Sequence, residues 1–330
     1  MGGQTDRPGT REAGGGGRRI GPSVAAVVLI SQLGCYSGCS STSRGARAAP
    51  PSMDAGTPPA PADSFMVPDS AGGVVLVGAG DIAGCPSAYD DEATAALAAR
   101  IRGAVFTLGD NAYPDGRTQD YSCYGASWGA FKDRTYPSPG NHDYRTGDGA
   151  PYFAYFGARA GPPGRGWYSY DLGGWHIVSL NSERDLDAQA VWLAADLAAH
   201  PARCTLAYWH RPLFTSGRRH RPYAPMRPIF RVLYEAGADL VLSGHNHQYE
   251  RFAPQDPDGR ADSARGIREF VVGTGGDALY TFRAPAPNSE VRYNGGHGVL
   301  KLTLYPDRYA FQFVSVAGKE FGDSGGGKCH

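Results

Sequence analysis

The chain has 330 residues, enough for one large domain or two of ordinary size. It carries 32 lysine and arginine residues and 32 aspartate and glutamate residues, so its formal net charge is zero. This balance excludes a global field that would attract nucleic acid or an anionic membrane, and no nucleic-acid specificity is evident.

The first 39 residues have the pattern of an export leader. Two arginines precede the apolar segment 24–33, which ends two residues before Cys35. This order is typical of a secretory signal, and the segment is too short to span a bilayer. The "LGC" ending at Cys35 resembles a lipoprotein cleavage box, but Gln32 stands where leucine is preferred, so a lipid anchor at Cys35 stays open. We expect an exported protein that is periplasmic, at the cell surface or extracellular.

Residues 40–71 consist largely of serine, alanine, proline and glycine. Such a segment cannot bury enough apolar surface to offset the entropy of ordering, so it is expected to be a flexible linker. Residues 72–330 show no internal repeat and no break in composition, and we expect them to form one domain.

Within that domain, short apolar runs end in glycine or a polar residue and predict buried strands. They are 74–81, 104–110, 205–210 and 238–245. Helical patterns occupy 90–103, 187–201 and 227–237. Asp90 and Asp91 are expected to cap the first helix, and Val191, Leu193 and Leu197 to form the apolar face of the second.

Two other segments alternate with period two and predict hairpins. The first, 166–181, turns at Gly173-Gly174, and the second, 298–316, turns at Pro306-Asp307. Strands joined by helices favour parallel pairing, whereas hairpins are antiparallel. The expected fold is therefore a mixture of α/β and α+β, a four-layer αββα sandwich of two mixed β-sheets flanked by helices.

Four cysteines of this domain allow three pairings, and strand geometry decides among them. Cys204 precedes His210 by six residues on an apparent strand, which separates them by roughly 20 Å. Cys85 and Cys123 each follow a loop at the other end of such strands. We therefore predict the disulfides Cys85–Cys123 and Cys204–Cys329, against the alternative of reduced thiols in a cytosolic protein.

Polar side chains recur at the carboxyl ends of the apparent strands, where loops of open α/β sheets converge. They are Asp81, Asp110, Tyr113, Asn141, His210, His245 and His247. Hard oxygen ligands and imidazoles suit first-row divalent or trivalent metal ions. Seven ligands are too many for one ion and suit two ions that share a carboxylate.

The segment "GHNH" at 244–247 supports two ions independently. Residues two apart in extended chain lie roughly 7 Å from each other and point the same way. His245 and His247 can therefore reach neighbouring ions about 3.5–4 Å apart. A lone histidine is more often a core residue, but four of the nine histidines follow strand-end signals.

Five blocks in chain order resemble those of the purple acid phosphatases, a branch of the calcineurin-like metallophosphoesterases. They are "GD" at 80–81, "GDNAY" at 109–113, "GNHD" at 140–143, "WH" at 209–210 and "GHNH" at 244–247. The resemblance implies a compact catalytic domain over 72–330. It also implies an exported dinuclear-metal phosphatase that hydrolyses phosphate monoesters by attack of metal-bound hydroxide.

Ala83 stands where the wider family has a histidine ligand, and the purple acid phosphatase branch instead uses a tyrosine, here Tyr113. An anionic phenolate in place of imidazole favours a trivalent ion, iron(III). The second ion is expected to be divalent iron, zinc or manganese. The resemblance implies iron(III) ligands Asp81, Tyr113 and His247, divalent-ion ligands Asn141, His210 and His245, and the bridge Asp110.

Two further histidines are candidates for catalysis. His142 follows Asn141, and the two are expected to hold the phosphoryl oxygens, with His142 also able to protonate the leaving oxygen. The alternative for His142 is a brace oriented by Asp143. His220 resembles the substrate-side histidine of the family, and its alternative is a surface side chain.

Two other functions stay open. One is a phosphodiesterase or nucleotide hydrolase of the same fold, because leaving-group specificity depends on loops. The other is a surface-tethered binding protein without turnover, whose expected mark is a missing ligand. No ligand of the pattern is missing.

Overall fold

The computed structural model describes residues 71–85, 89–318 and 320–330. The expected leader 1–39, with Cys35, lies outside the described residues, as does the linker 40–71 apart from Ala71. Among the described residues, no helix is long and apolar enough to cross a bilayer.

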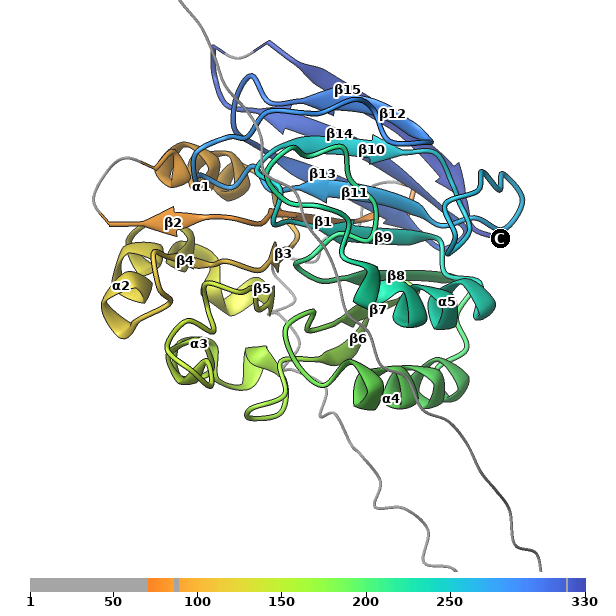
Figure 1. Cartoon of the computed structure of the whole chain (residues 1–330), viewed down its shortest axis with the longest axis horizontal. Helices are drawn as coiled ribbons and strands as arrows, with labels where there is room; N and C mark the ends of the chain where they lie inside the picture. Colours follow the sequence, from red (N-terminus) through yellow and green to blue (C-terminus); the bar gives the residue numbers. More distant parts are fainter. Residues whose placement is uncertain (1–70, 86–88, 319) are drawn as a thin grey trace, which may run out of the picture. The chain divides into compact units, whose positions relative to one another are not determined.

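Two large mixed sheets form the centre of the described part (Figure 1). The six-stranded sheet has the order β15 (Gly322–Lys328), β14 (Arg308–Ser315), β13 (Gly298–Tyr305), β1 (Val74–Ala79), β3 (Ala104–Leu108) and β5 (Thr135–Ser138). The seven-stranded sheet has the order β12 (Ser289–Tyr293), β10 (Tyr249–Phe252), β11 (Arg268–Val272), β9 (Leu240–Ser243), β8 (Cys204–Tyr208), β7 (Trp175–Ser179) and β6 (Tyr168–Leu172). A short parallel pair joins β2 (Ala83–Gly84) to β4 (Ala112–Tyr113).

Each sheet has parallel strands beside hairpins. β1, β3 and β5 pair in parallel, and so do β7, β8, β9 and β11. The hairpin β6–β7 turns at Gly173-Gly174 and the hairpin β13–β14 turns at Pro306-Asp307, as predicted. The expected fold of two mixed sheets flanked by helices is confirmed.

The helices occupy the connections between strands. They are α1 (Asp91–Arg100), α2 (Thr118–Ala126), α3 (Ala150–Phe156), α4 (Leu186–Ala199) and α5 (Arg227–Glu235), with 3-10 turns at Trp128–Arg134, Gly157–Ala160 and Ala224–Met226. α1 packs on the β13 side of the six-stranded sheet. α4 and α5 lie together beside β6, β7 and β8 of the other sheet (Figure 1).

The core follows this layering. One buried cluster joins side chains of both sheets, such as Leu76 of β1, Leu302 of β13 and Leu206 of β8. A second cluster lies between the seven-stranded sheet and its helices, with Val178 of β7 and Phe230 of α5. Burial of apolar side chains between layers therefore fixes the sheets against each other and against the helices.

Two local expectations for the helices need correction. Asp90 is the N-cap residue of α1, as expected, but its side chain makes no capping hydrogen bond, and its carboxylate accepts instead from Nδ1 of His297 at 2.6 Å. Val191 is 66% exposed. The buried face of α4 consists of residues three and four apart: Gln189, Trp192, Leu193 and Asp196. The two polar side chains, Gln189 and Asp196, can be buried because they form hydrogen bonds.

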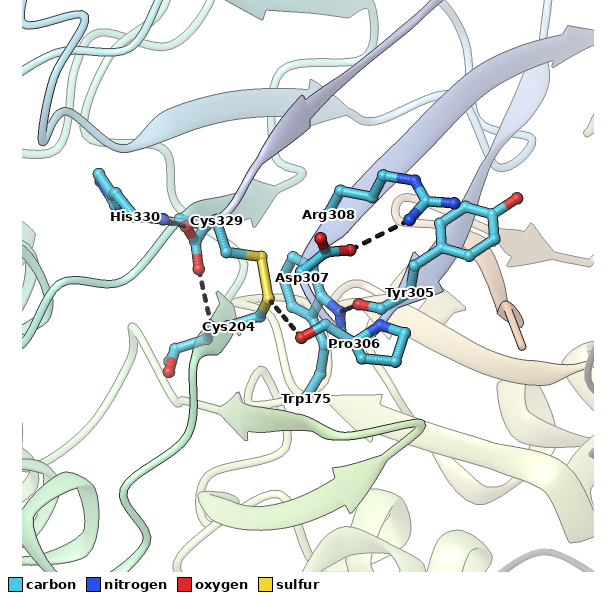
Figure 2. Close-up of a disulfide and its surroundings, with 10 residues drawn as sticks. Trp175, Cys204, Tyr305, Pro306, Asp307, Arg308, Cys329 and His330 are labelled. Carbon is cyan, nitrogen blue, oxygen red and sulfur yellow. Dashed lines mark hydrogen bonds and ion pairs between the residues drawn. A yellow bond between two sulfur atoms is a disulfide. The ribbon is translucent and has the colours of Figure 1, made fainter. Parts of the chain in front are cut away.

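Both predicted disulfides are confirmed. Cys85 and Cys123 close a separation of 38 residues beside β2 and α2. Cys204 and Cys329 close a separation of 125 residues (Figure 2). Cys204 begins β8 and Cys329 follows β15, so this bond links the two sheets covalently.

Candidate metal centre

The strand ends bring the sequence-predicted side chains to one rim. Each of five residues follows a strand of one of the two sheets: Asp81 follows β1, Asp110 follows β3, Asn141 follows β5, His210 follows β8 and His245 follows β9. Tyr113 ends β4, and His247 precedes β10 by two residues. Because these strands run in parallel within each sheet, their carboxyl ends place the polar side chains together.

The backbone at this rim is strained. Asp81, Asp110 and His245 have positive φ angles of 61°, 48° and 65°. Only five non-glycine residues of the described chain have positive φ. Such conformations cost free energy and persist where the surrounding structure holds them, typically at functional sites.

The first donor group surrounds the phenol oxygen of Tyr113. This oxygen lies 3.0 Å from Asp81 Oδ1, 3.2 Å from Asp110 Oδ2 and 3.2 Å from His247 Nε2. All four side chains are buried. Nδ1 of His247 donates to the carbonyl of Ala278 at 2.9 Å, which leaves the Nε2 lone pair directed at the group.

The second donor group surrounds Nε2 of His210. This nitrogen lies 3.2 Å from Asp110 Oδ2, 3.2 Å from Asn141 Oδ1 and 3.1 Å from His245 Nδ1. Nδ1 of His210 donates to the carbonyl of Leu108 at 2.7 Å, so its Nε2 lone pair also faces the site.

The same oxygen, Asp110 Oδ2, belongs to both groups. Donor atoms about 2.1 Å from one ion and at right angles to each other lie roughly 3 Å apart, as the donors do within each group. The residues therefore fit two adjacent metal ions with a shared carboxylate oxygen.

Electrostatics give a second argument for cations at this place. Burial raises the pKa of Tyr113 well above its ordinary value, and the charges of Asp110 and Asp81 raise it further. Burial alone would also raise the pKa of Asp110, but the imidazoles of His210, His142 and His245 hold it below its ordinary range. A phenolate beside two carboxylates therefore needs positive charge next to it, which metal ions supply.

Asp143 connects the loops that follow β3 and β5. Its buried carboxylate accepts from the backbone nitrogens of Asn111 at 3.1 Å and Gly140 at 2.8 Å, and from the hydroxyl of Tyr121 at 2.6 Å. These contacts hold the loops of Asp110 and Asn141 in register. The alternative that Asp143 orients His142 is wrong, because the ring of His142 has other partners.

His142 lies at the open side of the site. Its Nδ1 donates to the carbonyl of Pro114 at 2.6 Å, and its Nε2 lies 3.1 Å from Nη2 of Arg145 and 3.8 Å from Asp110 Oδ2. Its ring centroid is 4.4 Å from that of Tyr113. Nε2 thus lies between Arg145 and Asp110, beside the donor groups.

The structure also brings His220 to the site. Its ring centroid lies 3.9 Å from that of His245, and its backbone nitrogen donates to the side-chain oxygen of Asn246 at 3.3 Å. Burial, together with the charges of His247, His210 and Arg219, lowers the pKa of His220 to about 4. The alternative of a detached surface side chain is therefore disfavoured.

Sequence reasoning missed Arg211 and its partner Glu183. Nη1 of Arg211 lies 3.3 Å from Nε2 of His245, and its Nε donates to Glu183 at 2.7 Å. Arg211 directly follows His210, so its place was visible in the "WHRP" segment.

Sequence reasoning also missed Tyr280, which carried no such signal. Its ring centroid is 3.9 Å from that of His247, and the planes differ by 15°. Tyr280 comes from a loop between β11 and β12 with no recognisable motif.

The curated relatives are named purple acid phosphatases or acid phosphatases, one of them as a probable inactive member, and the chain matches only part of each. It is 35% identical over 149 residues to purple acid phosphatase 22 of Arabidopsis thaliana, covering 41% of this chain and 34% of that protein. It is 33% identical over 147 residues to acid phosphatase type 7 of Homo sapiens, covering 35% of this chain and 32% of that protein. The chain therefore spans about a third of the length of these relatives.

A solved purple acid phosphatase from yellow lupin (Lupinus luteus) seeds shares the fold, with a TM-score of 0.66 at 18% identity, over 79% of this chain and 54% of that one. The family model of the calcineurin-like phosphoesterases matches residues 76–249, more than half of the 330 residues and the segment that carries both donor groups. The chain therefore belongs to the calcineurin-like phosphoesterase family, with purple acid phosphatases among its relatives.

Proposed function

We propose that this protein is an exported dinuclear-metal phosphatase that hydrolyses phosphate monoesters. The observation that carries the proposal is the sharing of Asp110 Oδ2 by two donor groups with spacings of 3.0–3.2 Å. The first group would hold one ion through Asp81, Tyr113 and His247. The second would hold the other through Asn141, His210 and His245.

Iron(III) is the ion proposed for the group of Tyr113. That group offers two carboxylates and a phenol, and a phenolate adds a third negative charge that a trivalent ion balances better than a divalent one. The group of His210 offers two imidazoles, an amide oxygen and the shared carboxylate, which suit divalent iron, zinc or manganese.

When bound, the two ions supply Lewis acidity toward phosphoryl oxygens and lower the pKa of the attacking water. The side chains around them position the substrate. Asn141 and His142 would hold phosphoryl oxygens in front of the donor groups. His142, or His220 beside His245, would deliver a proton to the leaving alkoxide.

Arg211 is a further phosphate contact within this proposal. If Nδ1 of His245 serves as a ligand, Nε2 of that ring carries the proton. The guanidinium of Arg211, which lies 3.3 Å from Nε2, then needs another acceptor. A phosphoryl oxygen would supply it, while Glu183 keeps the guanidinium in place.

Hydrolysis of p-nitrophenyl phosphate and of bis(p-nitrophenyl) phosphate tests the proposal directly. The metal-loaded protein is expected to hydrolyse the monoester faster, and the variant Asp110→Asn to lose this activity. Absence of hydrolysis in protein that holds two ions per chain would contradict the proposal and favour a tethered binding protein.

A second candidate, a nucleotide hydrolase or phosphodiesterase, has one observation in its favour. Three guanidinium groups contact side chains of the site: Arg145 at His142, Arg211 at His245, and Arg219 over the ring of Tyr280 at 4.7 Å. They could bind anionic groups beyond the phosphate that is cleaved. Comparing nucleoside diphosphates with nucleoside monophosphates as substrates distinguishes this candidate.

Export is supported by the two disulfides, because such bonds persist in oxidising compartments. A lipid anchor at Cys35 would fix the protein to a membrane. Mass spectrometry of the mature amino terminus would show whether that cysteine carries lipid.

A further inference from the structure

A second cluster of metal-ligating side chains lies apart from the candidate metal centre. It consists of His176 of β7, Asp196 of α4 and His200, which follows the end of α4. One donor atom of each residue lies within 4.8 Å of those of the other two. We call these three residues the His176 cluster.

The His176 cluster lies at the opposite end of the strands from the metal centre. His176 is the second residue of β7 and pairs with Thr205 at the start of β8. His210 follows the other end of β8, and five residues of extended chain span roughly 16 Å. The cluster therefore shares no ligand with the metal centre.

The three side chains of the cluster are already in contact, with both histidines beside Asp196. Nε2 of His176 lies 2.8 Å from Asp196 Oδ2, and Nδ1 of His200 lies 3.4 Å from Asp196 Oδ1. The side chains of His176 and Asp196 are buried, whereas that of His200 is 50% exposed. The ring planes of the two histidines differ by 10° with centroids 5.0 Å apart.

Surrounding groups orient the buried members. Nδ1 of His176 donates to Asp171 Oδ1 at 2.9 Å, as Nε2 does to Asp196 Oδ2, so an ion would take the place of the proton on Nε2 while Asp171 holds the ring. The hydroxyl of Ser169 donates to Asp196 Oδ1 at 2.8 Å. A carboxylate behind a histidine and a donor behind a carboxylate are the usual supports of metal ligands.

The cluster also has access to solvent. Asp171 and His200 line a surface pocket of about 360 Å³ together with Trp175 and Arg203. Nδ1 of His200 donates to the main-chain oxygen of Asp196 at 2.9 Å, so the half-exposed ring would have to turn to offer a nitrogen lone pair to an ion. The pocket therefore reaches the cluster at His200, next to the buried pair His176 and Asp196.

We propose that His176, Asp196 and His200 bind one late first-row divalent ion such as Zn²⁺, with solvent at its open position. Two imidazoles and one carboxylate form a three-ligand zinc set, and a bound ion would tie the end of α4 to β7. In the absence of the ion, the three side chains form a hydrogen-bonded network.

Metal counting tests this proposal. The full domain, with its disulfides intact, is stripped with a chelator and dialysed against excess Zn²⁺ at neutral pH, and bound zinc per chain is measured by mass spectrometry. His200→Ala is expected to bind one ion fewer than the parent. His330→Ala, which removes a histidine outside the cluster, is expected to bind as many as the parent.

The zinc content is also compared between His210→Ala and the double variant His210→Ala, His200→Ala. The double variant should still bind one ion fewer, which separates this site from the metal centre. Circular dichroism checks that each variant is folded. Equal zinc in the parent and His200→Ala would overturn the proposal. An equal loss in His200→Ala and His330→Ala would also overturn it, since it would indicate unspecific binding by surface imidazoles.

Discussion

Gly84 lies opposite Tyr113 in the short parallel pair of β2 and β4, and Ala83 lies opposite Ala112. Ala83 stands where the wider family has a histidine ligand. It is therefore the chain neighbour of Gly84, the residue that pairs with Tyr113. The exchange of Ala83 for histidine and of Tyr113 for phenylalanine would thus move a ligand between adjacent strands at the same rim. This relationship makes the two positions a test of the proposed iron(III) ligand.

Tyr113→Phe is expected to abolish the colour of the iron-loaded protein, because charge transfer from a phenolate to iron(III) would be lost. Retention of the trivalent ion should weaken as well, since one anionic ligand is gone. Visible spectra and iron content measure both effects. The double variant Ala83→His, Tyr113→Phe should regain hydrolysis with two divalent ions and stay colourless. Parent protein that is loaded with iron, active and colourless under oxidising conditions would refute the phenolate ligand.

Asp110→Asn is expected to reduce kcat/KM by more than about 100-fold, because even side chains that only support a metal ligand change activity by about 10- to 100-fold. Asp110 would contact both ions, because its Oδ2 lies within 3.2 Å of a donor atom in each group. Metal content per chain, measured beside the kinetics, should fall for both ions. Asn141→Ala, the control, should lose at most the ion of the His210 group. Full activity and two ions in Asp110→Asn would exclude a bridging role.

The strands β1, β3, β8 and β9 and both hairpins could be predicted because they depend on local patterns, whereas no such prediction covers β10, β11 and β12. Apolar runs that end in glycine place β1 and β3, and glycine or proline pairs place the hairpin turns. β15 could not be predicted, since "GDSGGGK" has no apolar alternation and pairs along β14 through its backbone. The burial of Asp196 instead of Val191 on α4 likewise depends on tertiary partners, namely Ser169 and His176.

For the site residues too, some could be predicted from local patterns and others could not. Residues at strand ends could be named from sequence because strand direction determines where they meet. Tyr280 could not, because it reaches His247 from a long loop. The contact between His142 and Pro114 could not either, because the two residues come from different loops.

Gly140→Ala is expected to disturb the metal centre although glycine carries no ligand. A Cβ at Gly140 would lie 2.3 Å from both the backbone nitrogen and Oδ1 of Asp110. Relief of this overlap must shift the proposed bridge, at a cost of about 1–3 kcal/mol of unfolding free energy. Urea denaturation and metal content measure the two effects.

Gly322→Ala is the matched control for Gly140→Ala, because a Cβ at Gly322 would meet nothing within 4 Å. Its unfolding free energy should stay within about 0.5 kcal/mol of the parent, with metal content unchanged. If Gly140→Ala behaves like Gly322→Ala, the close approach of the loops after β3 and β5 does not constrain the centre.

The last prediction concerns Glu269, a fully buried carboxyl group on β11. Its oxygens accept from the backbone nitrogens of Leu213 and Phe214, each at 3.2 Å, and from the hydroxyl of Ser243 at 3.1 Å. Burial, opposed by these hydrogen bonds, raises the pKa of Glu269 from 4.5 to about 8. Between these two values the folded chain binds more protons at this site than the unfolded chain.

The contribution of Glu269 to the free energy of unfolding should therefore be highest below pH 4.5. It should fall as the pH rises toward about 8. The slope from one such group is at most about 1.4 kcal/mol per pH unit. Glu269→Gln cannot titrate, so its stability relative to the parent should increase with pH over this window, whatever the cost of the amide itself. Urea denaturation between pH 5 and about pH 9 measures the difference.

The control is Glu235→Gln, at an exposed position of α5, whose curve of unfolding free energy against pH should run parallel to that of the parent. Parallel curves for Glu269→Gln and the parent would show that Glu269 stays ionised in the fold, held by its three donors.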